Sequence, residues 1–330
     1  MANSNDGAEL RISVILTTFN REALLRDTID SLLAQTLNEE AYEIVIVDNN
    51  STDATKTVVE DYMRVSSHNI RYVFEPRQGL HHARNTGAKA AKAAILAYTD
   101  DDAICHESWL EAHLAAYVDA TIGCAGGKIV VKWDRDPPLW VLEFEHQLGK
   151  LDETFYGPTY RLLKPGDYIF GANFSIRRDI LFEVGGFNGD QVKDVLIGDA
   201  ESGLWTRIHK RGIQMAWIPD ALVWHVQSVN KNATLPNLKR RFGNLGIAAA
   251  SAQYKRERCG SLGLAAISAR SFSRAFTSKV IAVESRVRRS SLYYRLEVES
   301  AYFLKKALFE LKLALSKSKR DFVSKERWLD

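Results

Sequence analysis

Three consecutive carboxylates, Asp100, Asp101 and Asp102, close a short run that begins with the apolar residues 94–98. Such a run is typical of a central parallel strand, and in open α/β sheets ligands bind beyond the carboxyl ends of the strands. Adjacent acids repel one another, so a fold that holds three together favours a compensating charge, most economically a divalent cation with a phosphate-bearing ligand. The alternative is an acidic surface turn that starts a helix, because aspartate is a common helix N-cap.

The segments before these acids alternate between strand and helix patterns. Runs rich in aliphatic and β-branched residues predict strands at 11–17, 43–47, 70–74 and from 94, and a helical pattern at 80–92 leads into the last of them. Four strands separated by helices predict a doubly wound, mostly parallel sheet of the α/β class.

Polar side chains able to hold a nucleotide follow each predicted strand. They are Thr17, Asn20, Asp48, Asp53, Arg77, His81, His82, Arg84, Asn85 and the three aspartates. The chain has no Gly-x-Gly-x-x-Gly after the first strand and no Gly-Lys-Ser/Thr loop, the two common glycine-rich cradles for phosphate. We therefore expect a metal ion and basic side chains to neutralise the phosphates.

Four motifs, taken in order, carry a specific resemblance. They are Thr17-Thr-Phe-Asn20, Val47-Asp-Asn-Asn-Ser-Thr-Asp53, Gly79-Leu-His-His-Ala-Arg-Asn-Thr-Gly87 and Thr99-Asp-Asp-Asp102. Over residues 11 to about 226 the chain resembles the family 2 glycosyltransferases of the GT-A fold. The resemblance implies a Rossmann-like nucleotide-binding half, an acceptor half and a nucleoside-diphosphate sugar as the donor.

The resemblance also implies which residues form the donor site. The nucleotide-sugar-binding residues that it implies are Thr17, Phe19, Asn20, Asp48, Asp53, Arg77, Arg84, Asn85, Asp100 and Asp101. Among them, Asp48 is expected to contact the base and ribose. The residues alone leave a structural alternative, since 48–53 is turn-rich and Asp53 is able to cap a helix.

A site for Mn²⁺ or Mg²⁺ follows from the same resemblance. Asp102 is the expected direct ligand, and Asp100 is expected to serve the ion, a metal-bound water or ribose. Both cations prefer hard carboxylate and phosphate oxygens. His225 is a further candidate ligand, although a histidine beside a tryptophan is often a core residue or a hydrogen-bond partner of a ligand.

The segment Ile197-Gly-Asp-Ala-Glu201 resembles the family motif that carries the catalytic base. In the family an arginine and a glycine follow the base by six and eleven residues, and counting back from Arg207 and Gly212 puts Glu201 there, with Asp199 as neighbour or substitute. Inverting transfer needs one carboxylate to take the proton of the acceptor hydroxyl. The alternative is an acidic helix start, which the helix dipole favours without any catalysis.

Residues 133–167 show no clear period and are rich in Pro and Gly, which is typical of a lid or a binding loop. Trp133 and Trp140 are candidates to stack on the acceptor sugar, with buried packing as the alternative.

Charge is distributed unevenly over the 330 residues. Residues 251–330 hold 18 Lys or Arg against 8 Asp or Glu, whereas residues 1–250 hold 26 against 33. From Pro236 the pattern is helical, with an amphipathic stretch at 302–315. We expect this region to pack on the catalytic domain, to form a homodimer through its helices, or to lie on anionic lipid as a peripheral membrane contact.

Several classes of protein are disfavoured. No run approaches the roughly 18 apolar residues of a membrane-spanning helix, and residues 1–9 lack the apolar core of a signal peptide, so we expect a cytoplasmic protein, at most peripheral at the inner face of the membrane. Three widely spaced cysteines argue against a disulfide framework and a zinc site. The acidic residues 1–250 do not suit a phosphate backbone, so no nucleic-acid partner is expected.

The predicted organisation is a polar tail at 1–10, a glycosyltransferase domain at 11–230 and a basic α-helical region at 231–330. Within the domain, 11–118 would bind the nucleotide sugar and 119–230 the acceptor. The predicted reaction is metal-dependent, inverting transfer of a sugar from a UDP-sugar to a hydroxyl of a glycan or lipid-linked acceptor, in polysaccharide or glycolipid assembly. The alternatives are a nucleotidyltransferase, which would want a glycine- and lysine-rich loop after the first strand, and a nucleotide-sugar-binding protein without catalysis.

Overall fold

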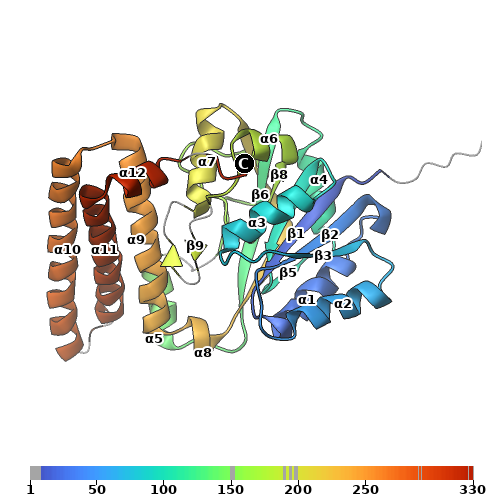
Figure 1. Cartoon of the computed structure of the whole chain (residues 1–330). Helices are drawn as coiled ribbons and strands as arrows, with labels where there is room; N and C mark the ends of the chain where they lie inside the picture. The colour runs from blue at the N-terminus through green and yellow to red at the C-terminus, as the bar shows by residue number, and fades with distance from the viewer. Residues whose placement is uncertain are drawn as a thin grey trace, which may run out of the picture.

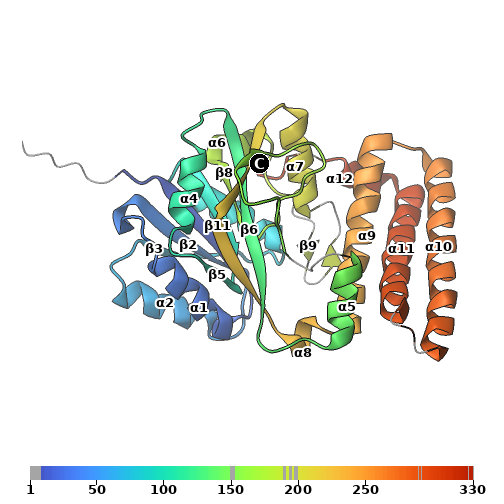
Figure 2. The ribbon, with the colours of Figure 1, turned by 180° about the vertical axis from the view of Figure 1, so that it is seen from behind.

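The computed structural model describes residues 9–148, 153–188, 191–192, 195–196, 200–288, 290, 292–325 and 327–329. A twisted mixed sheet with helices on both faces forms one part, and a layer of long helices stands beside it (Figures 1 and 2). The sheet has nine strands, eight of them in the order β3-β2-β1-β4-β8-β6-β11-β5, with β7 paired to β11.

The first half of the sheet is parallel, as predicted. Its strands are β1 Ile12–Thr18, β2 Tyr42–Asp48, β3 Ile70–Phe74 and β4 Ile95–Asp100. Every residue of β1 and β2 is buried, which explains why most residues of these strands are apolar. All four carboxyl ends lie at one edge, where the polar motifs begin.

Helices cover both faces of this half. They are α1 Glu22–Leu33, α2 Thr55–Val65, α3 Leu80–Ala90 and α4 Trp109–Ala116. One apolar core joins α1, α2 and α4 to the face of β1 that carries Val14 and Leu16, and a second core joins α3 to the face that carries Ile15. Successive strand residues point to opposite faces, so one strand supplies both cores.

The second half of the sheet mixes strand directions. Its strands are β5 Ala103–Cys105, β6 Ile122–Trp133, β7 Arg161–Leu162, β8 Phe174–Arg177 and β11 Gln214–Gln227. The sequence pattern predicts two short strands at 213–218 and 221–225, and this prediction is wrong. The chain forms a single strand whose register against β6 shifts between Ile218 and Leu222, and such a bulge interrupts the apolar pattern without ending the strand.

The remaining elements of this part are short. They are η1 Glu39–Ala41, α5 Leu139–Leu148, α6 Arg178–Glu183, β9 Gln191–Val192, β10 Val195–Leu196, α7 Ala200–Lys210 and α8 Val229–Asn232. The expectation that 133–167 lacks regular structure is wrong at α5. Val141 and Phe144 of α5 are buried against residues distant in sequence, including Val229 and Leu238, so tertiary packing rather than local periodicity stabilises this helix.

The C-terminal region is helical, as predicted, with α9 Leu235–Glu257, α10 Ser261–Val287, α11 Leu292–Leu315 and α12 Lys317–Val323. In the layer, α11 lies between α9 and α10 (Figure 1). Small residues let the helices approach closely: the Ser268 hydroxyl of α10 donates to the Ala307 carbonyl at 2.9 Å. A β-carbon added at Gly246 of α9 would overlap the Tyr302 carbonyl.

The end of the chain returns to the sheet-bearing part. The Trp328 amide donates to the Gly185 carbonyl at 2.7 Å, and Leu329 is buried in the core beneath α3, α6 and α7. Together with α5, this contact fixes the helical layer to the sheet. Within the described residues, no helix combines the length and the apolarity needed to cross a bilayer.

Candidate active site

A cleft of about 500 Å³ opens at the carboxyl ends of β1 and β4. It is lined by Thr17, Thr18, Phe19, Asn20, Arg21, Asn49, Gln78, Gly79, Leu80, Ala83, Asp100, Asp101, Asp102, His225 and Lys231. Parallel strands deliver their following loops to one edge of a sheet, which is why segments from across the first half meet there. The second half contributes through His225 of β11 and through Lys231 of α8.

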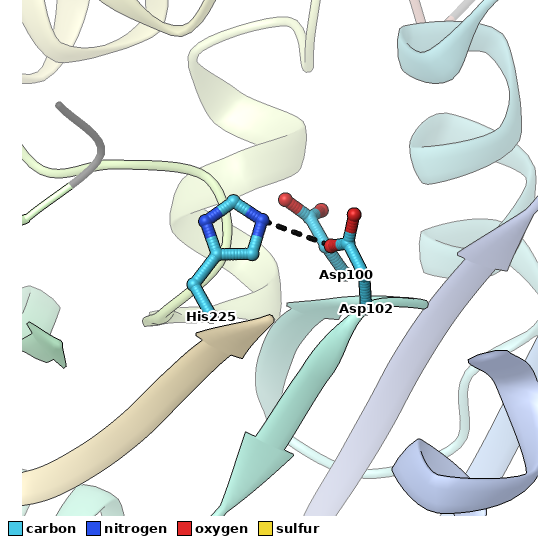
Figure 3. Close-up of side chains that lie close together, drawn as sticks. All are labelled: Asp100, Asp102 and His225. Carbon is cyan, nitrogen blue, oxygen red and sulfur yellow. Dashed lines mark hydrogen bonds and ion pairs between the residues drawn. The ribbon is translucent and has the colours of Figure 1, made fainter. Parts of the chain in front are cut away.

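Asp102 is hydrogen-bonded to two basic side chains. Its carboxylate accepts from Arg21 Nη1 at 3.0 Å. It also accepts from His225 Nε2 at 2.9 Å, as Figure 3 shows. The pairing of β11 with β5 sets His225 opposite Ala103 and thereby beside Asp102. Burial acts to raise the pKa of Asp102, but the hydrogen bonds and charges of His225 and Arg21 outweigh it and lower the pKa to about 2. Asp102 is therefore ionised at neutral pH.

The other two aspartates hold their protons more tightly than free carboxyls do. Burial is the main cause of the raised pKa of Asp100 and of Asp101, and the charge of Asp102 adds to it in both cases. Arg84 opposes this effect at Asp100, and Arg21 opposes it at Asp101. A further cation in the cleft would relieve the repulsion among the three acids.

The residues fit a divalent cation. One ligand atom from each of Asp100, Asp102 and His225 lies within 4.8 Å of the others, and all three side chains converge on one point (Figure 3). The donors are two carboxylates and an imidazole, and carboxylate oxygens suit Mg²⁺ and Mn²⁺. The 2.9 Å between His225 Nε2 and Asp102 Oδ1 also fits, since neighbouring ligands of an octahedral ion at about 2.1 Å lie about 3 Å apart.

Arg84 connects this acidic turn to the predicted base. It is 1% exposed, and its guanidinium donates to Asp100 Oδ1 at 3.1 Å, to Glu201 Oε1 at 2.6 Å and to the Gly171 carbonyl at 3.1 Å. Two acids from different halves of the domain thus share one buried cation. Glu201 and Arg84 lie 117 residues apart in sequence, so only the fold brings them together.

Glu201 stands in the first turn of α7, where a carboxylate also meets the positive end of the helix dipole. Its second oxygen accepts from the Tyr168 hydroxyl at 3.2 Å. Burial acts to raise the pKa of Glu201, but the charge of Arg84 outweighs it and lowers the pKa to about 2. A β-carbon at Gly171 would overlap both the Glu201 carboxylate and the Arg84 guanidinium, so a larger residue there would displace the pair.

Three of the predicted nucleotide-binding residues line the cleft from the end of β1 and the loop that follows it. They are Thr17, Phe19 and Asn20. Phe19 is 40% exposed, which leaves its ring available for stacking. Asn20 adopts a left-handed backbone with a φ of 52°, and its Oδ1 accepts from the Thr52 amide at 2.7 Å. Asn20 thus joins the loops after β1 and β2.

Asp48 and Asp53 make local hydrogen bonds and are not among the side chains that line the cleft. Asp48 accepts from the Ser51 amide at 2.8 Å and from the Tyr72 hydroxyl at 2.8 Å. Asp53 accepts from the Thr55 amide at 3.1 Å and the Glu22 amide at 3.2 Å, so it stabilises the starts of α2 and α1. Their roles toward a nucleotide stay predictions.

Arg77 and Asn85 likewise have protein partners. Arg77 donates twice to Glu75 at 2.9 Å, and its side chain is 65% exposed. The buried Asn85 amide pairs with the backbone of Phe187, donating to its carbonyl at 2.8 Å and accepting from its amide at 2.9 Å. Asn85 therefore ties α3 to the segment after α6, and its predicted contact with the nucleotide sugar stays a prediction.

The predicted acceptor residues lie where α5 meets other helices. Trp140 stacks on Tyr294 of α11 at 4.3 Å between ring centroids, and Trp133 packs on the apolar cluster around Val141. These contacts match the packing alternative, and a contact with an acceptor stays a prediction. Asp199, the alternative base, lies outside the described residues.

Several residues of the site were not predicted from the sequence. Arg21 directly follows the first motif, so its position next to Asn20 was an available signal. Asn49 lies inside the second motif, and its side chain fixes the next loop by donating to the Arg77 carbonyl at 2.7 Å and accepting from the Gly79 amide at 2.7 Å. Tyr168 and Lys231 belong to segments without a recognisable pattern, and the sequence carries no comparable signal for them.

Comparison with known proteins agrees with this geometry. The model of the family "Glycosyl transferase family 2" matches residues 13–185. A glucosyl-dolichyl phosphate glucuronosyltransferase of Haloferax volcanii is 28% identical over 183 residues, which are 54% of this chain and 56% of that protein. A validoxylamine A glucosyltransferase of Streptomyces hygroscopicus subsp. limoneus is 38% identical over 125 residues, 36% of this chain and 26% of that protein. The chain spans about a quarter to just over half of the length of these curated relatives.

Solved structures show the same fold. A mannosyltransferase from Pyrobaculum calidifontis, solved in complex with GDP-Man and Mn²⁺, has a TM-score of 0.61 at 22% identity, over 91% of this chain and 87% of that one. GalNAc-T7, solved with UDP, GalNAc and Mn²⁺, has a TM-score of 0.52 at 20% identity, over 74% and 48% of the two chains. The predicted GT-A architecture is confirmed.

Proposed function

The chain belongs to glycosyl transferase family 2, and from this premise we propose that it transfers a sugar from a nucleoside-diphosphate sugar, a UDP-sugar, to an acceptor hydroxyl with inversion. The observation that carries the proposal is the convergence of Asp100, Asp102 and His225 at one end of the 500 Å³ cleft. Solved proteins of the same fold contain Mn²⁺ with a nucleotide or nucleotide sugar, which supports a metal-dependent donor site.

In this proposal Asp102, Asp100 and His225 hold Mn²⁺ or Mg²⁺. The cation supplies charge neutralisation for the diphosphate leaving group. The loop after β1 receives the nucleoside, with Phe19 against the base and Arg21 beside the acids. Asp101 completes the acidic floor of the cleft.

Glu201 is the proposed general base. It takes the proton from the acceptor hydroxyl while the oxygen attacks the anomeric carbon from the face opposite the diphosphate. Arg84 and Tyr168 orient its carboxylate by hydrogen bonds of 2.6 and 3.2 Å. Arg84 keeps Glu201 ionised, and any loosening of that contact raises the pKa of Glu201 and makes it a stronger base.

The test of the donor site is Asp102→Asn. Loss of a residue that only supports a metal ligand typically lowers metal affinity by about 10- to 100-fold. Asp102 is a proposed direct ligand, so the affinity of this variant for UDP in the presence of Mn²⁺ should fall by at least that factor. Its melting temperature should stay near that of the wild type. Calorimetric titration of UDP, with and without Mn²⁺, measures this. A screen of nucleotide sugars for metal-dependent release of diphosphate then identifies the donor.

A metal-independent wild type would contradict the proposal, as would an Asp102→Asn protein that binds UDP and Mn²⁺ normally. Asp61→Asn is the matched control, because this substitution removes the same charge outside the cleft. Asp61 lies on α2 and forms an exposed ion pair with Arg64 at 2.6 Å.

We further propose a glycan or lipid-linked acceptor in polysaccharide or glycolipid assembly, with the protein in the cytoplasm. In this proposal the helical region either forms a homodimer or makes a peripheral contact at the inner face of the membrane. In support, the outer helix α10 exposes Phe276, Val280, Val283 and Val287 at spacings of four, three and four residues, a seam suited to an apolar partner. Light scattering of the purified protein measures the oligomeric state.

A further inference from the structure

A second hollow lies in the helical layer, at the end where α9 begins and α10 ends. It has a volume of about 480 Å³ and is lined by Leu235, Pro236, Lys239, Lys279, Val283, Arg286, Tyr293 and Glu297. We call these residues the basic groove. They come from α9, α10 and α11, and none of them lines the catalytic cleft.

The floor of the basic groove is a buried acid held by two bases. Glu297 is 4% exposed, and its carboxylate accepts from Lys239 Nζ at 2.7 Å and from Lys279 Nζ. The Lys239 and Lys279 side chains are 37% and 50% exposed, so both reach solvent. An ammonium group has three donors and Glu297 engages one from each lysine, so donors remain for a ligand.

Arg286 adds a third cation to the groove. Its guanidinium lies over the Tyr293 ring, 5.7 Å from the centroid. Three cations and one anion leave a surplus of two positive charges among the lining residues. The groove therefore suits an anionic group, and Glu297 holds the two lysines in place before the anion arrives.

An apolar stripe continues from the groove along α11. Tyr293 and Glu297 share one face of the helix with Leu304, Leu308, Leu311 and Leu315, because the positions follow one another at three-, four- or seven-residue intervals. Leu304, Leu308 and Leu315 are 43%, 40% and 80% exposed. We call these four leucines the leucine stripe. At a rise of 1.5 Å per residue, it extends about 27 Å from Glu297.

The basic groove also lies near the catalytic cleft. Lys231 of α8 lines the cleft, and Leu235 and Pro236 line the groove. Four residues of chain span at most about 14 Å, so the backbone of the groove begins within that distance of Lys231. Both views show α8 joining the sheet to the start of α9 (Figures 1 and 2).

We propose that the basic groove binds the phosphate of a lipid-linked phosphate, with the hydrocarbon chain along the leucine stripe. Phosphate oxygens accept from lysine and arginine in short, charge-assisted hydrogen bonds. A bound hydrocarbon chain would cover the exposed leucines, and removing their apolar surface from water favours binding. A soluble phosphate has no apolar part that would cover them. That such a lipid is the acceptor rests on the proposed function; the binding itself does not.

Co-sedimentation of the full-length chain with phosphatidylcholine vesicles, with and without phosphatidic acid, tests the proposal. The protein should pellet only with phosphatidic acid, and less as salt rises, because the attraction is electrostatic. Arg286→Ala should weaken binding about five-fold, which is what roughly 1 kcal/mol per basic residue near an anionic surface corresponds to. Leu304→Ser with Leu308→Ser should weaken it as well, at unchanged melting temperature.

Matched controls separate the groove from net charge and from folding. Lys56→Ala with Lys89→Ala removes two exposed charges from α2 and α3 and should bind vesicles like the wild type. Replacing Lys239, Lys279 and Glu297 together by Gln removes the cluster without leaving a buried charge unpaired, and should lose binding.

Three outcomes would overturn the proposal: a wild type that stays in the supernatant at low salt, groove variants that bind normally, or full competition by inorganic phosphate with no effect of the leucine changes. The last would show a site for a small anion. Titration of UDP and Mn²⁺ on the same variants keeps the two proposals apart, since donor binding should survive every groove substitution.

Discussion

The catalytic cleft and the basic groove are built on the same electrostatic arrangement with the signs reversed. Next to the cleft, the buried cation Arg84 is shared by Asp100, which lines the cleft, and by Glu201. In the groove, the buried acid Glu297 is shared by Lys239 and Lys279. Each shared charge holds two like charges close together and neutralises only part of them.

The difference in sign separates the two ligands. The cleft keeps a negative surplus beside His225, which suits a metal ion, and the groove keeps a positive surplus beside a leucine stripe, which suits a lipid phosphate. The exposure of the cations also differs, because the Arg84 side chain is 1% exposed whereas the Lys239 and Lys279 side chains reach solvent. The cleft arrangement should therefore contribute more to stability and be less tolerant of change.

Glu201→Gln gives the largest expected effect. The amide keeps the shape of the side chain but cannot take a proton, so turnover should fall by the 10²- to 10⁴-fold typical of a lost general base, with UDP binding retained. Steady-state kinetics on the same preparation measure both. Asp199→Asn should be milder, and the reverse order would make Asp199 the base.

Replacing the shared charges compares the two regions directly. Arg84→Met leaves Asp100 and Glu201 without the buried cation that they share and should cost about 3–5 kcal/mol of unfolding free energy. Lys239→Met removes a partly exposed lysine and leaves the buried Glu297 paired with the half-exposed Lys279, so it should cost about 1 kcal/mol or less. Urea unfolding measures both, and equal losses would refute the contrast in burial.

The dependence of stability on pH should report the ion pair between Glu201 and Arg84. Its pKa is lowered from 4.5 to about 2 in the folded chain, so the folded state binds this proton less readily than the unfolded state. The stabilisation, about 3 kcal/mol, is complete above about pH 4.5 and is lost as the pH falls toward 2. The difference in unfolding free energy between the wild type and Glu201→Gln should shrink over that range. A difference independent of pH would show that Arg84 does not stabilise the carboxylate.

Gly171→Ala tests how closely the Arg84–Glu201 pair is packed against the backbone. The added methyl group would displace the Arg84–Glu201 pair, at about 1–3 kcal/mol and with a loss of turnover. Gly260→Ala is the matched control, because open space surrounds that position and its φ of −70° suits alanine. Similar melting temperatures for the two variants would mean that the pair tolerates displacement.

Much of the fold follows from local pattern. The first three strands begin and end within one residue of the predicted bounds, and the fourth begins within one residue of its predicted start, because strands buried on both faces favour nearly continuous apolar runs. The pattern failed at α5 and β11, where the buried faces are completed by distant residues and by a bulge. Local periodicity carries no information about either.

The sequence by itself determined which residues stand at the carboxyl ends of the strands, and hence that Thr17, Phe19 and the three aspartates meet in one cleft. It also determined the surplus of basic residues in the helical region. Both properties are local, since they depend on residue type and on spacing along one element.

The tertiary structure alone decided which charges pair. Arg84 meets Glu201 across 117 residues, His225 meets Asp102 across 123, and Glu297 meets Lys239 across 58. Such pairs depend on how helices pack and how strands order in the sheet, and no repeat in the chain encodes them. The tertiary structure likewise decided that Trp140 stacks on Tyr294. It also decided that Asp53 accepts hydrogen bonds at the starts of two helices, because residues distant in sequence lie next to these side chains in space.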